Sequence, residues 1–315
     1  MLGPVAAVFP GQGTQSVGMG GWLFAAAPEV RPVLAAVSAA LGADVAQLCR
    51  LGPASLLTST EYAQPAIFCV NAAAWLYLRA QGVEPEVVAG HSLGELDALW
   101  AAGAITTEDA AALVVARGRA MASVPEAGCM AAVVGLDLDT VEALCRSTCA
   151  DGRLVVALHN AEDQLVVSGP ADAVKQLASA VAAEGGRSRP LATSHAFHSP
   201  LMEAAVPLFA EALAATAITD ARIPVVRNVS ARPTTDAAEL RQGLLDQLSR
   251  PVLWKETMAQ IAGLGVQVLI ECGDSKVLSG FARGYADLQR MNVRELSRVA
   301  VDPYPSEARQ VVGSR

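Results

Sequence analysis

The chain has 315 residues, of which 52% are hydrophobic and 17% charged, and its formal net charge is −8 at pH 7. This composition excludes intrinsic disorder, which requires low hydrophobicity and high net charge, and the acidic balance argues against binding of nucleic acid. No apolar run reaches the roughly 18 residues that a membrane-spanning helix needs, so we expect no membrane partner.

Short β-branched segments alternate with alanine-rich segments along most of the chain. The pattern predicts strands over 5–9, 86–90, 224–229 and 266–271, and helices over 16–26, 65–81, 92–102, 107–123, 199–216 and 237–249. Alternation of helices with nearly continuous apolar strands indicates a parallel sheet that is covered on both faces.

The middle of the chain follows a different order of elements. From about 128 to 193 the pattern predicts strand, helix, two strands, helix and strand, which is typical of a ferredoxin-like fold. We therefore predict an α/β protein with a large subdomain over 1–127 and 194–298 and a small inserted subdomain over 128–193. Residues 299–315 have no hydrophobic period and predict a tail or linker.

The cysteine pattern indicates thiols rather than disulfides. The six cysteines form no C-x-x-C pair, and the start of the chain has no basic segment typical of a signal peptide. We expect reduced, mostly buried thiols in a cytoplasmic protein. The cysteines are Cys49, Cys69, Cys129, Cys145, Cys149 and Cys272.

Gly90-His91-Ser92-Leu93-Gly94 matches G-x-S-x-G between a predicted strand and a predicted helix. This context is typical of a nucleophile elbow, a sharp turn that exposes the serine oxygen. The helix N-terminus adds free N–H groups and a positive dipole end beside a reacting carbonyl. The alternative is a serine that only caps the helix. We favour Ser92 as a candidate nucleophile.

A glycine-rich loop, Pro10-Gly11-Gln12-Gly13-Thr14-Gln15, follows the first predicted strand. Such a loop could cradle a phosphate, but the third glycine of G-x-G-x-x-G and a P-loop lysine are missing. Alternatively, its backbone N–H groups face the serine and help to form an oxyanion hole. The loop by itself leaves both interpretations open.

A serine nucleophile needs a neighbouring base, and the chain has only four histidines. His195 and His198 are the main candidates. His91 adjoins Ser92, but neighbouring side chains on a tight turn point apart, and His159 ends a strand of the predicted insert. Any of the four could also be a hydrogen-bonded structural residue.

Arg117 lies in the predicted helix 107–123, whose other residues are nearly all small or apolar. Its side chain either reaches solvent or meets an anion. If the substrate carries a carboxylate, the guanidinium is a natural bidentate clamp for it.

Eight ordered motifs over residues 5–295 resemble those of one family: the malonyl-CoA:acyl carrier protein transacylases and polyketide synthase acyltransferases. The motifs are FPGQGTQ at 9–15, QPAIF at 64–68, GHSLGE at 90–95, RGRAM at 117–121, HAFHSPLM at 195–202, NVS at 228–230, RPVLW at 250–254 and ECGDSKVL at 271–278. The resemblance implies an α/β-hydrolase-like large subdomain with a ferredoxin-like small one, and a site in the cleft between them.

The resemblance also implies catalytic roles. Ser92 would be acylated by malonyl-CoA, and His198 would act first as its base and then as an acid. No carboxylate would complete a triad, and a main-chain carbonyl near Asn228 would orient His198 instead. The backbone N–H groups of Gln12 and Leu93 would form the oxyanion hole.

Substrate-binding roles follow from the same resemblance. Arg117 would hold the malonyl carboxylate, Gln64 would line the pocket, and His91 joins the substrate-binding candidates. Phe197 would fill the space that a 2-methyl group needs, which favours malonyl over methylmalonyl units. We expect no metal and no bound cofactor, since malonyl-CoA is the substrate and phosphopantetheine is carried by the partner, an acyl carrier protein. We expect the enzyme to be a monomer.

The sequence departs from the family pattern at two places. Family members often have an aromatic residue after GHSLGE, where this chain has Leu96 followed by Asp97. The C-terminal motif often contains GPG, where this chain has Gly273-Asp274-Ser275. Neither place touches the implied chemistry.

Three functions compete for this sequence. The first is malonyl transfer, and the second is hydrolysis of stalled acyl groups from carrier proteins, whose enzymes tend to lack the arginine; Arg117 therefore favours transfer. The third, a non-catalytic interaction module, is disfavoured by the Ser92 and His198 pair. HAFHSPLM resembles polyketide-type members, so we favour a discrete enzyme acting in trans over primary fatty acid synthesis or a domain of a larger synthase.

Overall fold

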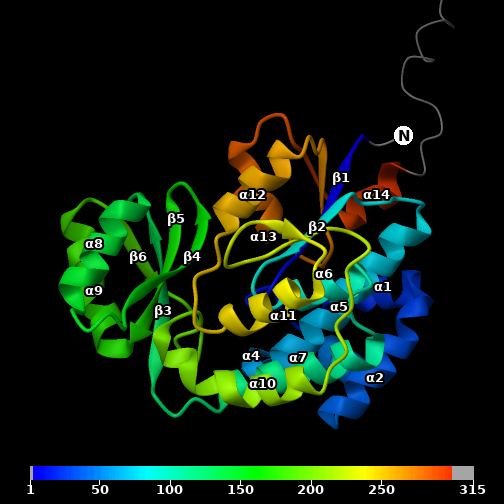
Figure 1. Ribbon diagram of the computed structural model, residues 1–315, viewed down its shortest axis with the longest axis horizontal. Coiled ribbons are helices and arrows are strands. Elements are labelled where there is room, and N and C mark those ends of the chain that lie inside the picture. The colour runs from blue at the N-terminus through cyan, green and yellow to red at the C-terminus, as the bar shows by residue number, and fades with distance from the viewer. Residues whose placement is uncertain (1–2, 300–315) are drawn as a thin grey trace, which may run out of the picture.

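Two β-sheets organise the chain in this computed structural model, which describes residues 3–299 (Figure 1). The larger sheet has six strands in the order β10-β9-β1-β2-β7-β8, and its first five strands are parallel. Its strands are β1 (Val5–Phe9), β2 (Val87–Gly90), β7 (Val225–Val226), β8 (Pro233–Thr234), β9 (Val268–Glu271) and β10 (Gln289–Asn292). The predicted parallel sheet is confirmed.

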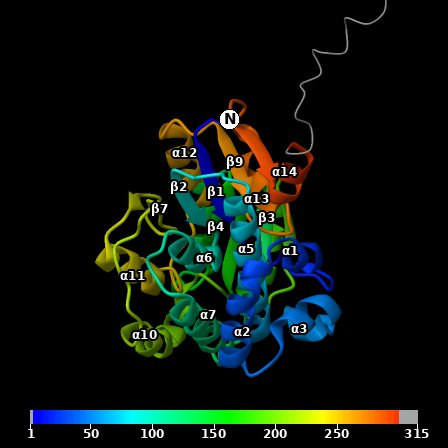
Figure 2. The same cartoon turned by 90° about the vertical axis from the view of Figure 1, so that its right-hand side faces the viewer.

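Helices cover both faces of this sheet, because side chains on both faces of its central strands are buried. In β1, Val5, Ala7 and Phe9 belong to one buried cluster, whereas Ala6 and Val8 belong to another. Figure 2 shows α2, α5 and α7 together on one side. The helices of the large subdomain are α1 (Gly21–Ala26), α2 (Arg31–Leu41), α3 (Val45–Leu51), α4 (Ala54–Thr58), α5 (Thr60–Ala80), α6 (Gly94–Ala101), α7 (Thr107–Ala122), α10 (Val206–Ala214), α11 (Ala237–Asp246), α12 (Trp254–Gly263), α13 (Val277–Phe281) and α14 (Val293–Val299), with short 3-10 helices at Pro28–Val30, Pro200–Ala205 and Ala282–Gly284.

The smaller sheet is antiparallel and lies to one side of the larger sheet (Figure 1). Its strand order is β4-β5-β3-β6, the order expected of a ferredoxin-like βαββαβ unit. Two helices pack on it through a separate apolar cluster. The elements are β3 (Gly128–Val134), α8 (Leu138–Thr148), β4 (Val155–Ala161), β5 (Gln164–Pro170), α9 (Ala171–Ala183) and β6 (Arg187–Pro190).

The two subdomains are joined along β4. Val252 forms a parallel bridge with Leu158 and exchanges backbone hydrogen bonds with Ala157 and His159 at 2.9 and 3.0 Å. The side chain of His159 also meets Glu256 at the start of α12, at 2.7 Å. This single backbone bridge and the side-chain contact hold the small subdomain beside the large one.

Some predicted elements differ from those observed. The predicted helix over 16–26 begins only at Gly21, because Gly18 and Gly20 have φ of 94° and 73°, which a right-handed helix excludes. The predicted strand over 224–229 is limited to β7, and the segment 199–216 is a 3-10 helix followed by α10. Helices α2 to α4 were not predicted.

Residue 299 is the last residue of α14, and the rest of the predicted tail, 300–315, lies outside the described residues. The exact division of the chain at 127/128 and 193/194 stays a prediction.

None of the six cysteines, all of which lie within the described part of the chain, forms a disulfide. Burial raises the pKa of the Cys49 thiol to about 12. Between residues 3 and 299 no group of three or more His, Cys, Asp or Glu side chains could hold a metal ion. In the same range no single helix is long and apolar enough to cross a membrane, although Pro28–Leu41 and Val45–Leu51 together pass that test across a 96° bend.

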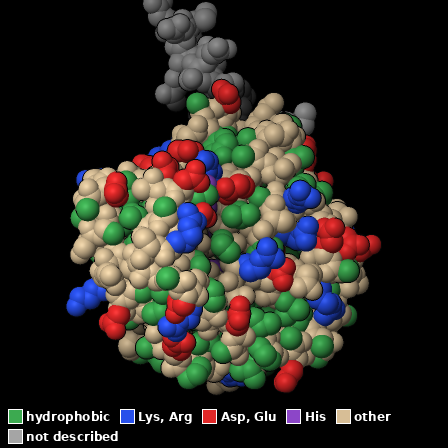
Figure 3. All heavy atoms as spheres, turned by 60° about the vertical axis from the view of Figure 1, so that its left-hand side comes forward, with side chains coloured by type: hydrophobic (Ala, Val, Ile, Leu, Met, Phe, Trp, Pro, Cys, Tyr) green, Lys and Arg blue, Asp and Glu red, His purple; other side chains and the backbone are tan. Residues whose placement is uncertain are grey.

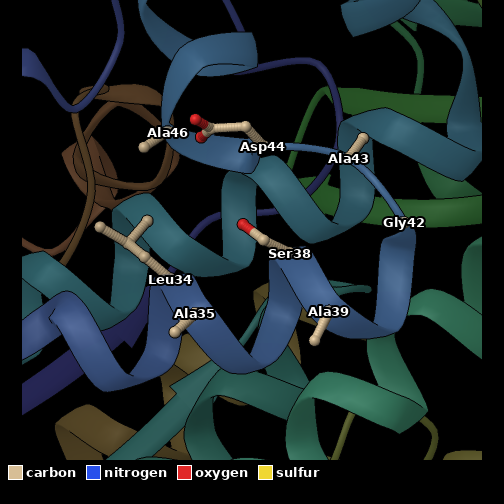
Figure 4. A pocket seen from close by; sticks show the side chains of 8 residues that line it. All are labelled: Leu34, Ala35, Ser38, Ala39, Gly42, Ala43, Asp44 and Ala46. Carbon is tan, nitrogen blue, oxygen red and sulfur yellow. The ribbon is translucent and has the colours of Figure 1, made fainter.

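An open hollow lies on the surface where α2 meets α3 (Figure 4). Its lining consists mainly of alanine side chains, with Leu34, Ser38 and Asp44 among them. Asp44 is the N-cap of α3 and accepts a hydrogen bond from Gln47 N at 2.9 Å, so its carboxylate has a structural partner.

Candidate active site

The sharp turn between β2 and α6 presents the side chain of Ser92. Ser92 has φ of 54°, a left-handed conformation that is rare for a residue with a side chain. Gly90 permits the turn, because a Cβ on it would lie 1.8 Å from the carbonyl carbon of Gly94. Asn228 spans the turn, since its Oδ1 accepts from Ser92 N at 2.7 Å and its Nδ2 donates to Gly90 O at 2.6 Å. These bonds hold the strained backbone in place.

His198 is the histidine that meets Ser92. Its Nε2 lies 2.7 Å from Ser92 Oγ, and its Nδ1 lies 2.6 Å from the main-chain oxygen of Gln247. A carbonyl can only accept, so Nδ1 carries the proton and Nε2 presents its lone pair to the serine hydroxyl. His198 lies in the loop after β6, and Gln247 is the residue that follows the last turn of α11. Both residues lie beside Ser92, at the end of β2.

The predicted orienting carbonyl near Asn228 is wrong. The acceptor for His198 is Gln247 O, at the C-terminal end of α11. The Asn228 carbonyl is already engaged, because it accepts from Leu253 N at 2.9 Å and so anchors the chain segment leading into α12. Asn228 therefore contacts the nucleophile turn, and not the histidine.

His198 is neutral at physiological pH. Burial and the nearby positive charge of Arg117 lower the pKa of its imidazole to about 3, and its hydrogen bond to Gln247 O opposes this only in part. A neutral imidazole is the form that can accept the serine proton.

The other histidines lie away from this contact. His195 is partly exposed, with Nδ1 2.8 Å from Ser194 Oγ. His159 pairs with Glu256 at the joint between the subdomains. His91 points away from the serine hydroxyl, as expected for a neighbour on a tight turn: its Nε2 meets Asn160 Oδ1 at 2.8 Å, and burial lowers the pKa of the ring. Through this bond the turn contacts the small subdomain.

The loop after β1 lies directly against the nucleophile turn. Strands β1 and β2 are neighbours with Phe9 opposite Gly90, so their following loops meet. The approach is close at Gly11, where a Cβ would lie 2.4 Å from His91 O. Within the described residues neither the N–H of Gln12 nor that of Leu93 donates a hydrogen bond, so both remain available to an oxyanion near Ser92. This position favours the second interpretation of the loop.

Side chains hold two carbonyl groups of that loop and the Gln12 side chain. Asn71 Nδ2 donates to Pro10 O at 2.9 Å, and Thr14 Oγ1 donates to Gly11 O at 2.9 Å. The Gln12 side chain donates to Thr60 Oγ1 at 3.0 Å. The peptide that carries the Gln12 N–H is therefore fixed from its carbonyl side, which is the preorganisation that oxyanion binding requires.

Arg117 is almost fully buried, at 1% exposed, and it reaches the serine. Its Nη1 donates to Gln64 Oε1 at 2.6 Å, and its Nη2 donates to Gln247 Oε1 at 2.7 Å and to Ser92 Oγ at 3.3 Å. All three acceptors are neutral. Burial lowers the pKa of the guanidinium to about 10, so it still carries its charge at neutral pH. The site thus holds a cation without an anion in contact.

Three residues of the site were missed in the sequence. Gln247 contacts both His198 and Arg117, and Glu95 Oε2 accepts from Gln247 Nε2 at 2.7 Å. Glu95 could have been found, because it is a charged residue near the start of the helix predicted over 92–102, three residues after Ser92. Gln247 and Asn160 carry no local signal, since their contacts arise only when distant segments meet.

Phe197 is buried in the core beside His198, with its ring 6.0 Å from that of His195. Gln64 is buried as well, and its Nε2 contacts Met121 Sδ at 3.4 Å. The structure therefore gathers Ser92, His198, Arg117 and Gln64 into one connected group of side chains, with the loop at Gln12 beside them.

Comparisons with known proteins show the family of the chain. The family described as "Acyl transferase domain" matches residues 7–297. The malonyl CoA-acyl carrier protein transacylase of Salmonella typhimurium is 40% identical over 287 residues, which cover 90% of this chain and 93% of the relative. The crystal structure of a malonyl-CoA:acyl carrier protein transacylase from Xanthomonas oryzae superposes with a TM-score of 0.91 at 37% identity and covers 96% of this chain and 99% of its own.

A third comparison includes a partner. The structure titled as a type II polyketide synthase acyl-carrier protein in complex with its malonyl-transacylase superposes with a TM-score of 0.87 at 34% identity, and it covers 92% of this chain and 95% of its own.

Both departures from the family pattern lie behind the loop that carries Gln12. Asp97, fully buried on α6, accepts from Asn71 Nδ2 at 3.0 Å, and the same amide group holds Pro10 O. Gly273 packs on the Pro10 ring, and a Cβ on it would come within 2.7 Å. Asp274 then binds the start of α1, accepting from Gly20 N and Trp22 Nε1, each at 3.1 Å.

Replacing Asp97 by asparagine should change how stability depends on pH. Burial holds the pKa of the Asp97 carboxyl well above its usual 3.8, so the fold keeps its proton where the unfolded chain loses it. The contribution of Asp97 to the free energy of unfolding is therefore complete below pH 3.8. It is lost as pH rises toward the folded-state pKa, by up to about 1.4 kcal/mol per pH unit. Asparagine is neutral throughout and can still accept from Asn71.

We therefore expect the free energy of unfolding of Asp97→Asn, relative to wild type, to increase between pH 5 and pH 8, as measured by urea unfolding. Asp44→Asn is the matched control, since Asp44 is an exposed helix cap that asparagine also fills. Equal pH slopes for wild type and Asp97→Asn would contradict the protonated state of Asp97.

Proposed function

The chain belongs to the acyl transferase domain family, and from this premise we propose that it moves a malonyl group from malonyl-CoA to the phosphopantetheine thiol of an acyl carrier protein. The observation that carries the proposal is the buried Arg117 guanidinium, which lies 3.3 Å from the oxygen of Ser92. An acyl group on that oxygen would meet a cation, so the site suits an acyl chain that ends in a carboxylate.

The first half of the reaction acylates the serine. His198 Nε2 takes the proton of Ser92 Oγ while Oγ bonds to the thioester carbonyl carbon of malonyl-CoA. The oxyanion that develops is held by the N–H groups of Gln12 and Leu93. The carbon–sulfur bond then breaks, His198 returns its proton to the CoA sulfur, and malonyl-Ser92 remains.

The second half reverses these roles with a new thiol. The carrier's phosphopantetheine thiol gives its proton to His198 and attacks the ester carbonyl of malonyl-Ser92. The carbon–oxygen bond breaks, and Ser92 Oγ recovers the proton from His198. The acyl donor of the first half-reaction is a thioester, which is already activated, so a Ser92 and His198 dyad oriented by a main-chain carbonyl is sufficient to attack it. The scheme is ping-pong, with the two thiols using the site in turn.

Substrate selection rests on the side chains around Arg117. Gln64 and Gln247 orient the guanidinium through its two terminal nitrogens, which leaves it aimed at the acyl chain. Phe197 beside His198 would oppose a 2-methyl branch on that chain. A single methyl group is worth only about 1–3 kcal/mol, so this discrimination is graded.

The carrier is proposed to approach beside the joint of the two subdomains. A cavity of about 290 Å³ there is lined by the end of β4, the start of α12 and the segment after α13, including Asn160, Lys255 and Arg283. Asn160 holds His91, next to Ser92, so this cavity adjoins the site. Figure 3 shows lysine and arginine side chains spread over the face of the molecule on the small-subdomain side, with acidic side chains between them.

We further propose that the carrier belongs to a polyketide synthase and that the enzyme acts on it in trans. Two observations support this: the HAFHSPLM segment, and the similarity to a transacylase that is described in complex with a type II polyketide synthase carrier. The named relatives above are transacylases, and none of them is a hydrolase.

Intact-protein mass spectrometry tests the transfer. Wild type mixed with malonyl-CoA should gain one malonyl adduct, and Ser92→Ala should gain none. Arg117→Ala should lose at least about 100-fold in kcat/KM for malonyl-CoA, because removing one partner of a buried ion pair costs about 3–5 kcal/mol. The matched control is Arg119→Ala, two residues along the same helix and exposed in an ion pair with Glu61. Unchanged malonyl loading in Arg117→Ala would refute the clamp.

The choice of carrier is tested on the isolated malonyl-enzyme. Its discharge by a polyketide synthase carrier should be at least about tenfold faster than its discharge by a fatty acid synthase carrier, a difference of about 1.4 kcal/mol in transition-state binding. Both carriers are used in the phosphopantetheinylated form at equal concentration. Faster discharge by the fatty acid carrier would overturn the polyketide assignment.

Charge reversal at Arg283 separates the two half-reactions. Arg283 is exposed and, within the described residues, forms no ion pair, so its charge is free to attract an acidic carrier. Arg283→Glu should slow discharge to the carrier by about three- to tenfold and weaken its salt dependence. Loading from malonyl-N-acetylcysteamine, which has no phosphate, should be unchanged. Arg31→Glu on α2 is the control for net charge, and equal effects of both variants would remove Arg283 from the docking surface.

A further inference from the structure

One residue, Gln247, contacts both of the charged or basic groups of the site. Its main-chain oxygen accepts from His198 Nδ1, and its side-chain Oε1 accepts from Arg117 Nη2. The side chain is fully buried. The two ends of an amide differ, one being an acceptor and the other a donor, so the contact with Arg117 requires that the amide be held in one of its two orientations.

Glu95 supplies the contact that selects this orientation. Its Oε2 accepts from Gln247 Nε2 at 2.7 Å, which directs Oε1 toward Arg117. Glu95 is fully buried in the first turn of α6, and its backbone N–H donates to Ser92 O at 3.1 Å. The carboxylate therefore comes from the same short segment as the nucleophile.

We propose that Glu95 is a positioning residue for the malonyl carboxylate: it fixes the Gln247 amide, and through that amide it holds the Arg117 guanidinium in register with Ser92. The proposal rests on the proposed function, because it assigns Glu95 to the part of the site that binds the acid end of the acyl chain. Glu95 touches neither substrate nor the reacting atoms.

The alternative orientation of Gln247 is unfavourable for a simple reason. If the amide turned over, its NH2 group would face the guanidinium, and two donors would meet without an acceptor. Arg117 Nη2 would lose one of its two bonds in a buried site. An unpaired buried donor carries the full penalty of desolvation, so the position of the guanidinium depends on the acceptor that Glu95 keeps in place.

The surroundings of Glu95 make the orientation of the Gln247 amide depend on whether the Glu95 carboxyl is protonated. Arg117 on α7 and Arg227 after β7 are the charged groups that face it, with Gly243 of α11 and the Asn228 backbone N–H packed beside them. Burial outweighs these groups and raises the pKa of the Glu95 carboxyl to about 7. A protonated Glu95 can donate to Gln247 Oε1, which permits the turned-over amide. The positioning of the Arg117 guanidinium is therefore lost as pH falls through about 7.

The test measures kcat/KM for loading of Ser92 from malonyl-CoA and from acetyl-CoA in four proteins: wild type, Glu95→Ala, Arg117→Ala and the double variant. Glu95→Ala should lose about 10- to 100-fold with malonyl-CoA, the value of a hydrogen bond to a charged group. In the Arg117→Ala background the same substitution should change acetyl loading less than about twofold. An equal loss in both backgrounds would mean that Glu95 supports the fold or His198 instead, and would overturn the proposal.

The conservative variant Glu95→Gln provides a readout that does not depend on tolerance of alanine. Like protonated Glu95, its amide can donate to Gln247 Oε1 as well as accept from Gln247 Nε2, so its malonyl kcat/KM should lie near the low value that wild type has at pH 6. The wild-type malonyl kcat/KM should fall as pH is lowered from 8 to 6, whereas that of Glu95→Gln should stay flat. A variant that keeps the wild-type pH profile would overturn the proposal. Failure of wild type to form any malonyl adduct would refute the proposed function itself, which is a distinguishable result.

Discussion

The structure depends on a buried positive charge that has no negative partner in contact. The Arg117 guanidinium is enclosed by Gln64, Gln247 and the hydroxyl of Ser92, which are neutral acceptors. Taking an ion out of water costs several kcal/mol, and neutral hydrogen bonds repay only part of that cost. The site is therefore primed for an anion. Burial lowers the pKa of the neighbouring His198, and the charge of Arg117 lowers it further. Under the proposed function, Arg117 would therefore attract a carboxylate and also help burial to keep the base neutral.

The register of the parallel sheet places the remaining groups around that charge. Phe9 lies opposite Gly90, so the loop after β1 and the turn after β2 start side by side at the carboxyl edge of the sheet. The turn presents Ser92 and the loop presents the Gln12 N–H. The segment after β7 supplies Asn228, which clamps the turn from its other side. Three neighbouring strand ends thus build the nucleophile and its surroundings before any side chain on a distant helix is added.

Sequence patterns predicted features that depend on neighbouring residues, but they did not predict contacts that form only when distant segments of the chain meet. The G-x-S-x-G context predicted the turn at Ser92, and the βαββαβ order predicted the small sheet. The predicted helix over 16–26 failed because a hydrophobic period does not reveal the positive φ of Gly18 and Gly20. The orienting carbonyl was assigned near Asn228, whereas the acceptor is a peptide oxygen at the end of α11. Any residue can supply a main-chain oxygen, so no residue type marks it.

Under the proposed function, the sharing of Gln247 would keep the two ends of a small substrate in register. The main chain of Gln247 sets the position of His198, and its side chain sets the position of Arg117. Its own backbone N–H donates to Gly243 O at 3.0 Å, so the last turn of α11 carries both contacts. A shift of this turn would move His198 and Arg117 together. In the proposed reaction, the distance between the reacting carbonyl and the acid end of the acyl chain would then be preserved, which placement of each group on a separate loop could not ensure.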